Sequence, residues 1–464
     1  MSIFPFLLPF LRKQMQWRWF AAAILFFSGT GFPLLADDEL PVLGEHAAFN
    51  LDQEVKIGER FYQHLLARGL IETNPLLDRY INDLGERLLS ALDRRVRDYR
   101  FFIVRDGSIN AFALPGGYIG IHVGLILSAE TPDQLASVMA HEIAHVRLRH
   151  GLKLMERSSS VSSATILTLL AGLLVGGGTD LGAALVYGGV AGGQQTMVNY
   201  TREFEYEADR LGIALLQGAE FDGRGMVEFF ELLGKASGNS ELQGIEYLRT
   251  HPVSSNRVSE ALARLRPSSA QKSGPGTFPL FKDYLFYANS DSMAISGSQF
   301  RQALASIKRG KEDDANELLE DLYQKNSDNF WYGYAYAENL EFIKQSDKAQ
   351  KVYRQLLEIY PDDSIISIKM MNLLKQAGRY TEALTIARRL ENRYPDDKAV
   401  FFELADIYRL LKKGLQEMIA QADYHRLTGS KDLAIKLYGR VLGSPDIDLA
   451  TESKVKEKLA ELNR

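Results

Sequence analysis

The sequence predicts a mostly helical α+β protein with two domains. At 464 residues the chain is too long for one ordinary domain, and its content of 46% hydrophobic and 24% charged residues is typical of globular proteins. Helical periodicity runs through most of the chain, whereas β-prone runs are confined to residues 99–124. Beyond residue 297 the sequence repeats itself. These observations predict a mixed helix–strand domain followed by an array of helix pairs.

Charge and cysteine content exclude several classes of function. The formal net charge is −5, which gives no indication of a nucleic-acid partner. The absence of cysteine excludes disulfides, thiolate metal sites, cysteine catalysis and lipid attachment through an N-terminal cysteine. Any zinc ion must therefore be held by nitrogen and oxygen.

The N-terminus has the pattern of an export signal. Basic residues between positions 12 and 18 precede the apolar run 19–28, and small residues lead to Ala36 before acidic Asp37. We expect a signal peptide at 1–36 and a mature chain outside the cytoplasm. An uncleaved membrane anchor is the alternative, although Gly29, Gly31 and Pro33 leave the run short for a span.

Two helices and a small β region are expected next. Residues 50–91 alternate apolar and charged residues at helical spacing, and residues 99–104 form a strand signal. The turn 115–117 (Pro-Gly-Gly) joins two β-prone runs, and the second, 118–123, has the alternation of a half-exposed edge strand. Such an edge could pair with an extended peptide, while a simple hairpin is an equally good interpretation.

The stretch 131–147 has the start signals of a helix. Thr131 can cap it, Pro132 suits the first position, and Gln134 has the spacing of a capping box. On this helix His141 and His145 lie one turn apart on one face, as two ligands of one metal ion must.

The chemistry of this helix favours zinc. Glu142 follows the first histidine and can reach a water molecule beside the ion, which is the place of a general base. The apolar flanks indicate a buried helix, and buried His, Glu and His need a metal or a dense hydrogen-bond network. The alternative is a surface helix with two solvated histidines.

The third ligand is expected from the helical stretch 201–212. An open catalytic site without cysteine needs a carboxylate, and Glu203, Glu205 and Glu207 compete for this role. Glu205 is favoured because Asp209 lies four residues later on its face, where it could orient a ligating histidine. A solvated acidic face suits the other two.

Two features near this site have structural interpretations. His150 falls outside the spacing of a third histidine ligand, and we interpret it as structural. The segment 158–195 is rich in Ser, Gly, Ala and Leu, and the apolar run within it is too short to span a bilayer. We expect a packed helix or a flap there, with peripheral membrane association as the alternative.

Together these motifs resemble a family. His141-Glu142-Ile-Ala-His145, followed by Glu205-Tyr-Glu-Ala-Asp209, is similar to the HtpX and CAAX-prenyl-protease type of zinc metallopeptidase, and Asn110-Ala-Phe-Ala fits as well. The resemblance implies a gluzincin-type endopeptidase with one zinc ion per chain. It implies that Glu205 is the third ligand and that Asp209 supports the site.

The resemblance extends to a His-Pro loop. Thr250-His251-Pro252 is similar to a loop whose histidine can occupy the open zinc position and restrain the enzyme; a loop histidine before a helix near Ser255 is the alternative. Arg257 could bind a substrate carbonyl or oxyanion, or an acid on its own helix.

The C-terminal region has the signature of tetratricopeptide repeats. Tyr360-Pro-Asp-Asp363 recurs as Tyr394-Pro-Asp-Asp397, a shift of 34 residues (394 − 360), which also relates Ala315, Ala349 and Ala383. A last, less regular unit with Ala434 and Tyr438 follows an insertion. Stacked helix pairs of this kind bind peptides or proteins, and a structural cap is the alternative role.

The expected organisation is a signal peptide (1–36), a zinc metallopeptidase domain (37–265), a linker (266–296) and a repeat domain (297–464). The resemblance implies a periplasmic protease that acts on unfolded or misassembled outer-membrane proteins, with its repeats docking the barrel-assembly machinery. A chaperone or assembly scaffold with incidental proteolysis is the alternative. A protease tethered by its uncleaved signal is a third interpretation.

Overall fold

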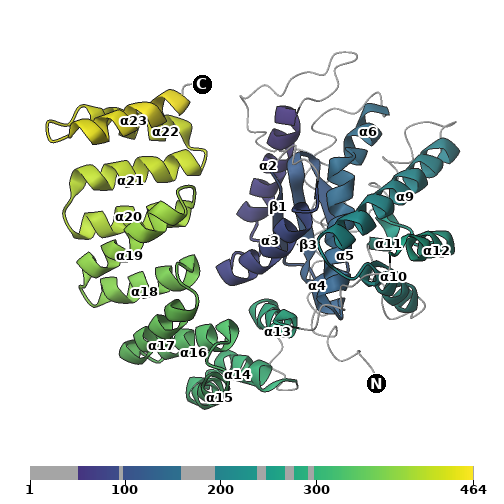
Figure 1. Ribbon diagram of the computed structural model, residues 1–464, viewed down its shortest axis with the longest axis horizontal. Coiled ribbons are helices and arrows are strands. Elements are labelled where there is room, and N and C mark those ends of the chain that lie inside the picture. The colour runs from purple at the N-terminus through teal and green to yellow at the C-terminus, as the bar shows by residue number, and fades with distance from the viewer. Residues whose placement is uncertain are drawn as a thin grey trace, which may run out of the picture. The chain divides into compact units, whose positions relative to one another are not determined.

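The computed structural model describes residues 51–92, 98–157, 194–237, 247–266, 276–290 and 297–462. The expected signal peptide and most of segment 158–195 lie outside the described residues. Within those ranges, no helix combines the length and hydropathy needed to cross a membrane. The described elements form two compact units, one ending with α13 and one beginning with α14 (Figure 1).

The first unit is an α+β domain. Its elements are α2 (Leu51–Ala67), α3 (Pro75–Leu89), β1 (Arg100–Val104), β2 (Ala111–Leu114), β3 (Tyr118–His122), α4 (Val123–Ser128), α5 (Pro132–Arg147), α6 (His150–Arg157), α9 (Gln194–Gly218), α10 (Arg224–Ser237), α11 (Tyr247–Thr250), α12 (Ser255–Arg264) and α13 (Phe278–Asn289). The two helices and the strand expected between 50 and 104 are all present.

The three strands form one small sheet in the order β1-β3-β2. β3 pairs parallel with β1 and antiparallel with β2, so β3 is the central strand and its residues 119–122 are buried. The expectation of a half-exposed edge strand at 118–123 was wrong. The glycine in this strand does not mark an edge. Gly120 is needed because the Phe112 ring packs against it, and a Cβ atom at this position would lie only 2.3 Å from that ring. The edge strands of the sheet are β1 and β2.

The Pro-Gly-Gly turn between β2 and β3 needs its glycines. Gly116 and Gly117 have φ angles of 81° and 95°, in the left-handed region that other residues rarely adopt. A Cβ on Gly116 would lie 2.6 Å from the Cα atom of Val55 on α2. The turn is therefore wedged tightly against the first helix.

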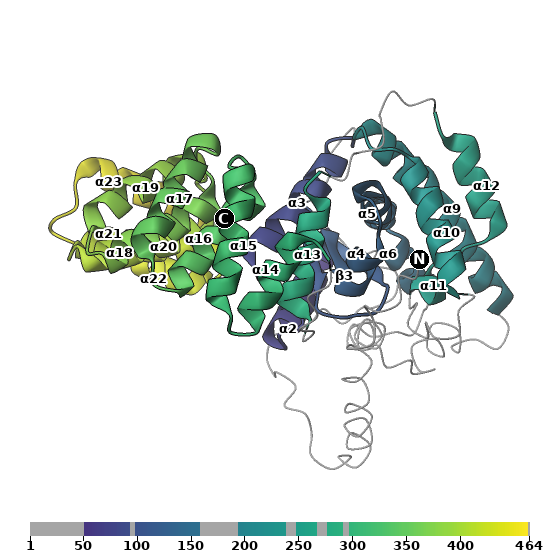
Figure 2. The same cartoon turned by 90° about the horizontal axis from the view of Figure 1, so that it is seen from below.

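α5 is the central helix of the unit. Thr131 Oγ1 accepts a hydrogen bond from the Gln134 amide, as the N-cap of a capping box does. Gln134 Oε1 accepts its return bond from the Glu130 amide, one residue before the N-cap, so the expected capping box is present in a shifted form. Every α5 residue from Pro132 to Ala144 is buried. Its neighbours include α3, α9 and α10, and α12 packs on the outer side of α9 (Figure 2).

The segment expected to be a linker contains a helix of the first unit. The Phe281 ring of α13 stacks on Tyr80 of α3 at 4.0 Å between centroids, and Asn289 donates a hydrogen bond to Glu72. Composition suggested a linker because Pro, Ser and Gly crowd residues 267–276. The apolar face of 278–286 (Phe-Pro-Leu-Phe-Lys-Asp-Tyr-Leu-Phe) instead completes the hydrophobic packing of the unit.

The second unit is a stack of antiparallel helices. They are α14 (Gln299–Lys308), α15 (Glu312–Lys325), α16 (Phe330–Phe342), α17 (Ser346–Ile359), α18 (Ser364–Gln376), α19 (Tyr380–Arg393), α20 (Lys398–Leu410), α21 (Gly414–Leu427), α22 (Lys431–Leu442) and α23 (Leu449–Leu462). The expected insertion before the last unit includes a helix of regular length, α21, so only the sequence pattern is irregular there.

The repeated residues have structural roles in this stack. Ala315, Ala349, Ala383 and Ala434 are completely buried, where larger side chains would keep neighbouring helices apart. The last Asp of each Tyr-Pro-Asp-Asp motif caps the following helix: Asp363 accepts from the amide of Ile366, and Asp397 from that of Ala399. The motif thus ends one helix and starts the next.

Candidate metal centre

Small side chains let α5 and α9 approach each other closely. Ala140 and Ala144 of α5 and Ala208 of α9 are completely buried. A Cβ on Gly212 of α9 would lie only 3.3 Å from the backbone nitrogen of His141. This close approach carries the acidic face of α9 to the histidines of α5.

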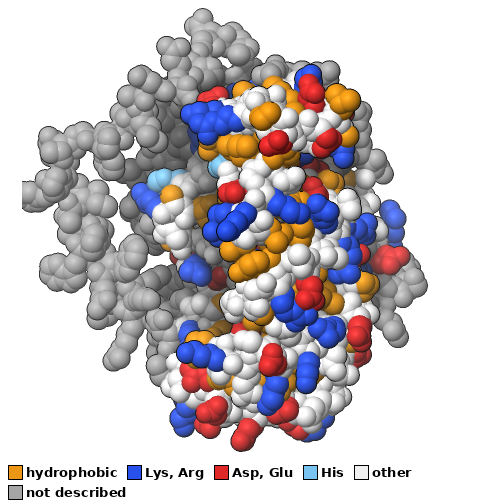
Figure 3. Space-filling view, turned by 90° about the vertical axis from the view of Figure 1, so that its left-hand side faces the viewer, with side chains coloured by type: hydrophobic (Ala, Val, Ile, Leu, Met, Phe, Trp, Pro, Cys, Tyr) orange, Lys and Arg blue, Asp and Glu red, His pale blue; other side chains and the backbone are white. Residues whose placement is uncertain are grey.

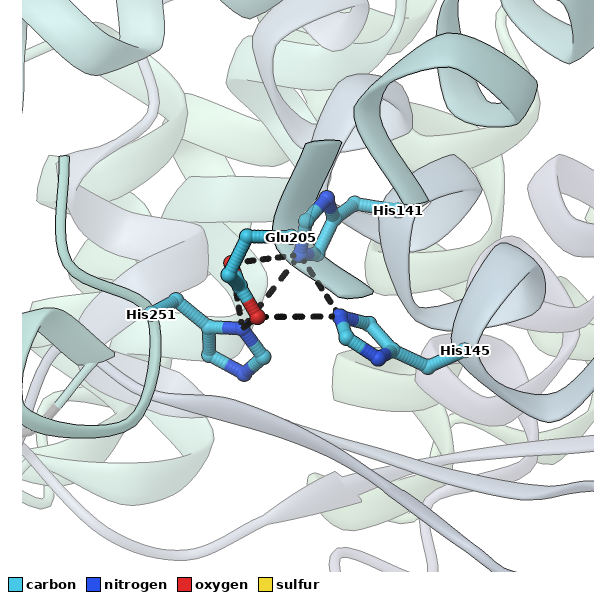
Figure 4. Close-up of side chains that lie close together, drawn as sticks. All are labelled: His141, His145, Glu205 and His251. Atoms are coloured by element: carbon cyan, nitrogen blue, oxygen red, sulfur yellow. Dashed lines mark hydrogen bonds and ion pairs between the residues drawn. The ribbon is translucent and has the colours of Figure 1, made fainter. Parts of the chain in front are cut away.

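Four side chains converge on one point. His141 and His145 come from α5, Glu205 from α9, and His251 directly follows α11 (Figure 4). One potential ligand atom from each lies within 4.8 Å of all the others. Glu203, one of the competing carboxylates, is exposed, whereas Glu205 is buried.

The distances fit a tetrahedral zinc ion. His141 Nε2 lies 2.9 Å from His145 Nε2 and 3.4 Å from Glu205 Oε2, and His145 Nε2 lies 3.3 Å from Glu205 Oε1. Ligands about 2.0 Å from a tetrahedral ion are about 3.3 Å from one another. The nitrogen and oxygen donors are also the set that zinc takes in catalytic sites, so the residues fit the ion.

The outer nitrogen of His141 faces a carboxylate. His141 Nδ1 lies 3.0 Å from Asp209 Oδ1, so in the neutral imidazole Nδ1 carries the proton and Nε2 is free to bind a metal ion. Asp209 accepts two hydrogen bonds from Arg257, from Nε at 2.7 Å and from Nη2 at 2.8 Å. The acid that Arg257 binds is thus on α9 and not on its own helix, α12.

Arg257 is itself enclosed by the protein. It is 3% exposed, its Nη1 donates to the carbonyl of Pro252 at 2.7 Å, and the same atom lies 2.9 Å from Glu205 Oε2. The guanidinium therefore links the His-Pro loop to Glu205 and Asp209 of α9.

The outer nitrogen of His145 faces a second histidine. His145 Nδ1 lies 3.0 Å from His150 Nδ1, and His150 Nε2 lies 3.1 Å from Glu207 Oε2. The His150 ring is 1% exposed and stacks on Phe204 at 4.3 Å between centroids. Glu207 is thus a partner of His150 and not only part of a solvated acidic face.

Glu142 and His251 lie on the open side of the cluster. Glu142 is 1% exposed, and its Oε1, which has no hydrogen-bond partner among the described residues, lies 3.6 Å from His251 Nε2. His251 directs Nδ1 at Glu205, and its ring stacks on Tyr247 at 4.6 Å. His251 thus lies between the carboxyl groups of Glu142 and Glu205, with one ring nitrogen toward each.

The electrostatics of the cluster favour a cation. Burial opposes the charging of His141, but Glu205 and Asp209 outweigh it and raise the pKa of His141 to about 10. Burial, together with His141, lowers the pKa of His145 to about 3. Burial also opposes ionisation of Glu205, yet His251 and His141 bring its pKa well below the usual range. An anionic Glu205 thus lies beside a His141 that favours its charged form, an arrangement in which a metal cation can take the place of the proton.

Glu142 has the opposite shift. Burial raises the pKa of its carboxyl above the usual range, while the nearby His251 and His141 act against that rise. A raised pKa strengthens a carboxylate as a base, which is the property that proton removal from water requires.

Sequence reasoning named His150 only as a structural residue, and it did not identify Tyr247 or Arg149. Tyr247 precedes His251 by one helical turn, and this spacing could have suggested their stacking. The contact of His150 with His145 has no such signal, because a separation of five does not place two residues on one helix face. Arg149, which lies between α5 and α6, adopts a φ of 57°, and no sequence pattern predicts this conformation.

Comparisons with known proteins agree with this geometry. The model of peptidase family M48 matches residues 75–265, and a tetratricopeptide repeat model matches residues 344–407. The beta-barrel assembly-enhancing protease of Escherichia coli is 31% identical over 435 residues, which cover 87% of this chain and 88% of that protein. The protein of that name from Yersinia pestis is 27% identical over 464 residues and 93% of each chain.

A more distant relative shares the first unit. The mitochondrial metalloendopeptidase OMA1 of Schizosaccharomyces pombe is 25% identical over 253 residues, 53% of this chain and 71% of that protein. The family model spans the whole cluster of His141, His145, Glu205 and His251, and the similarity to the bacterial relatives continues through the repeats. The chain therefore belongs to peptidase family M48, alongside the beta-barrel assembly-enhancing proteases, and is a zinc metalloendopeptidase.

Proposed function

We propose that the chain is a periplasmic endopeptidase that degrades misassembled outer-membrane proteins and assists their assembly. The observation that carries the proposal is the convergence of His141, His145 and Glu205 at tetrahedral spacing beside the buried carboxyl of Glu142. One zinc ion per chain, held by these three ligands, would polarise the scissile carbonyl and make water a nucleophile at neutral pH.

Protein side chains carry out the proton transfers and hold the ligands in place. Glu142 takes the proton of the attacking water and returns it to the leaving nitrogen, for which its raised pKa is suited. Asp209 holds His141 in the tautomer that directs Nε2 inward, and Arg257 fixes Asp209 by its paired hydrogen bonds. In this conformation Arg257 positions these acids, and it would reach a substrate oxyanion only if the loop moved.

His251 restrains the enzyme as a fourth ligand. Its Nδ1 lies 3.0 Å from Glu205 Oε1 and 3.3 Å from His141 Nε2, which is the spacing of a tetrahedral partner. Water and a substrate carbonyl need the same position. Cleavage therefore requires that the loop 250–254 withdraw.

The relatives' names and the repeats support the substrate class and the partner. The two bacterial relatives are named for the assembly of β-barrels, and a stacked helical array is a surface for protein docking. Lys and Arg side chains gather over the middle of one face of the repeats with apolar side chains between them, and Asp and Glu side chains are most frequent toward its lower end (Figure 3). We assign this array to the barrel-assembly machinery. An unfolded barrel strand could pair with the edge strand β2.

A scaffold with incidental proteolysis is the second candidate. It is favoured by the same position of His251, because a permanently closed site would leave the repeats as the working part. The two candidates differ in one respect: only the protease depends on Glu142.

The test measures zinc content and cleavage of an unfolded outer-membrane β-barrel protein by the purified chain. Glu142→Gln should retain one zinc per chain and lose cleavage by at least about a hundredfold. Glu130→Gln, an exposed change just before the same helix, is the matched control and should behave as the wild type. Absence of zinc would overturn the site. Full function of Glu142→Gln in barrel assembly inside cells would establish the scaffold instead.

A further inference from the structure

The two histidine ligands are supported in different ways. Asp209 lies directly against the outer nitrogen of His141, whereas no carboxylate within hydrogen-bond distance of His145 Nδ1 is found among the described residues. That position is taken by His150, whose far nitrogen contacts Glu207. We propose that His150 and Glu207 form a positioning pair for the ligand His145, and that they set the affinity of the site for zinc.

The assignment of protons in this chain of contacts has one solution. His145 must keep Nε2 free of a proton in order to bind a metal, so its proton lies on Nδ1. His145 Nδ1 then donates to His150 Nδ1 at 3.0 Å, which obliges His150 to carry its own proton on Nε2. His150 Nε2 donates in turn to Glu207 Oε2 at 3.1 Å. Each group thus fixes the tautomer of the next.

A turn between two helices creates this contact. α5 ends at Arg147 and α6 starts at His150, with Arg149 between them at a φ of 57°. This left-handed residue interrupts the helix and places the His150 ring against His145 of α5. Arg149 Nη2 lies 2.6 Å from the buried carboxylate of Glu54 on α2, which holds the turn in place.

Packing holds the His150 ring in the required plane. The ring stacks on Phe204 at 4.3 Å with 12° between the planes, and it is 1% exposed. Phe204 precedes Glu205 on α9, so one turn of α9 supplies a metal ligand, the stacking ring and the outer carboxylate of Glu207. The support of His145 is therefore tied to the position of Glu205.

The test separates hydrogen bonding from packing. His150→Phe keeps a ring that can stack on Phe204 but removes the acceptor for His145 Nδ1. We expect the zinc dissociation constant, measured by competition with a chelator, to rise about 10–100-fold. His150→Gln restores an acceptor oxygen and should recover part of that loss. Circular dichroism of the metal-free proteins checks that each variant is folded.

A second pair of variants tests the role of Glu207. Glu207→Ala should weaken zinc binding by a few fold, because about two-fifths of its side chain is exposed and water can replace it in part. Glu203→Ala, an exposed carboxylate one turn away on the same helix, is the matched control and should bind zinc as the wild type does. The cobalt-substituted protein gives a second readout, because the visible spectrum reports the geometry of the ligands.

The outcomes distinguish this role from the metal site on which it rests. Failure of the wild-type chain to bind zinc would overturn the proposed site and this inference with it. Wild-type affinity and an unchanged cobalt spectrum in His150→Phe would overturn the positioning role alone. If His150→Phe does not fold, unchanged affinity in Glu207→Ala relative to Glu203→Ala overturns the pair.

Discussion

His251 directs its Nδ1 atom at Glu205, at 3.0 and 3.1 Å from the two carboxylate oxygens. The ring is held there by stacking on Tyr247, whose carbonyl also accepts a hydrogen bond from the His251 amide at 2.8 Å. The contact joins a loop to the proposed metal ligand Glu205, so the proposed mechanism makes withdrawal of the loop and access of substrate a single event.

Removal of the His251 side chain should therefore activate the enzyme. His251→Ala is expected to increase cleavage of an unfolded protein about tenfold, the factor that follows if the closed arrangement is favoured by about 1.4 kcal/mol. The measurement is the initial rate at equal zinc content. His64→Ala, an exposed histidine on α2, serves as the control and should not change the rate. A rate in His251→Ala at or below that of the wild type would show that the loop does not restrain the site.

The pair of Arg257 and Asp209 should make a large contribution to stability. Lysine keeps the charge but cannot form both hydrogen bonds, so Arg257→Lys should lower the free energy of unfolding by about 2–3 kcal/mol. Arg264→Lys on the same helix changes an exposed pair with Glu260 and should cost less than about 0.5 kcal/mol. Urea unfolding of the first unit measures both. Equal midpoints for the two variants would refute the structural role of the buried pair.

Removal of the metal should destabilise the first unit alone. With free zinc a hundredfold above its dissociation constant, the ion contributes about 2.7 kcal/mol to the folded state, and a chelator removes this contribution. Calorimetry should show one transition moving to lower temperature while that of the repeats stays in place. If both transitions moved together, the two units would not unfold independently.

The buried alanines of the repeats should not tolerate enlargement. Ala349 is completely buried, so Ala349→Leu forces neighbouring helices apart and should lower the free energy of unfolding by about 1–3 kcal/mol. Lys351→Leu, an exposed change on the same helix α17, should leave it nearly unchanged. Thermal unfolding followed by circular dichroism compares them, and zinc content should remain at one ion per chain in both. An unfolding temperature of Ala349→Leu equal to that of the wild type would show that the helix crossing can accommodate a larger side chain.

Local signals and exact repetition explain what could be predicted. The capping residues and apolar flanks of α5 act within one helix, so the element that carries His141 and His145 was evident from its own sequence. The shift of 34 residues repeats both the small residue at a helix crossing and the capping Asp, which together define a helix pair. Such features need no knowledge of distant parts of the chain.

Long-range packing explains what could not be predicted. Gly120 was interpreted as a sign of an edge strand, because its partner, the Phe112 ring, is known only once β2 and β3 are paired. The contact of His150 with His145 depends on the left-handed turn at Arg149, which a carboxylate on α2 secures. Both depend on elements that approach each other only in the fold.

The position of α13 determines where the peptidase can be cut from the rest of the chain. The family match ends at residue 265, but the Phe281 ring of α13 lies on Tyr80 and is completely inaccessible to water. A chain shortened to that limit would expose an aromatic surface on α3 and would invite aggregation. An excised catalytic fragment should therefore extend through Asn289, and a fusion or a protease site introduced to separate the two units belongs after it.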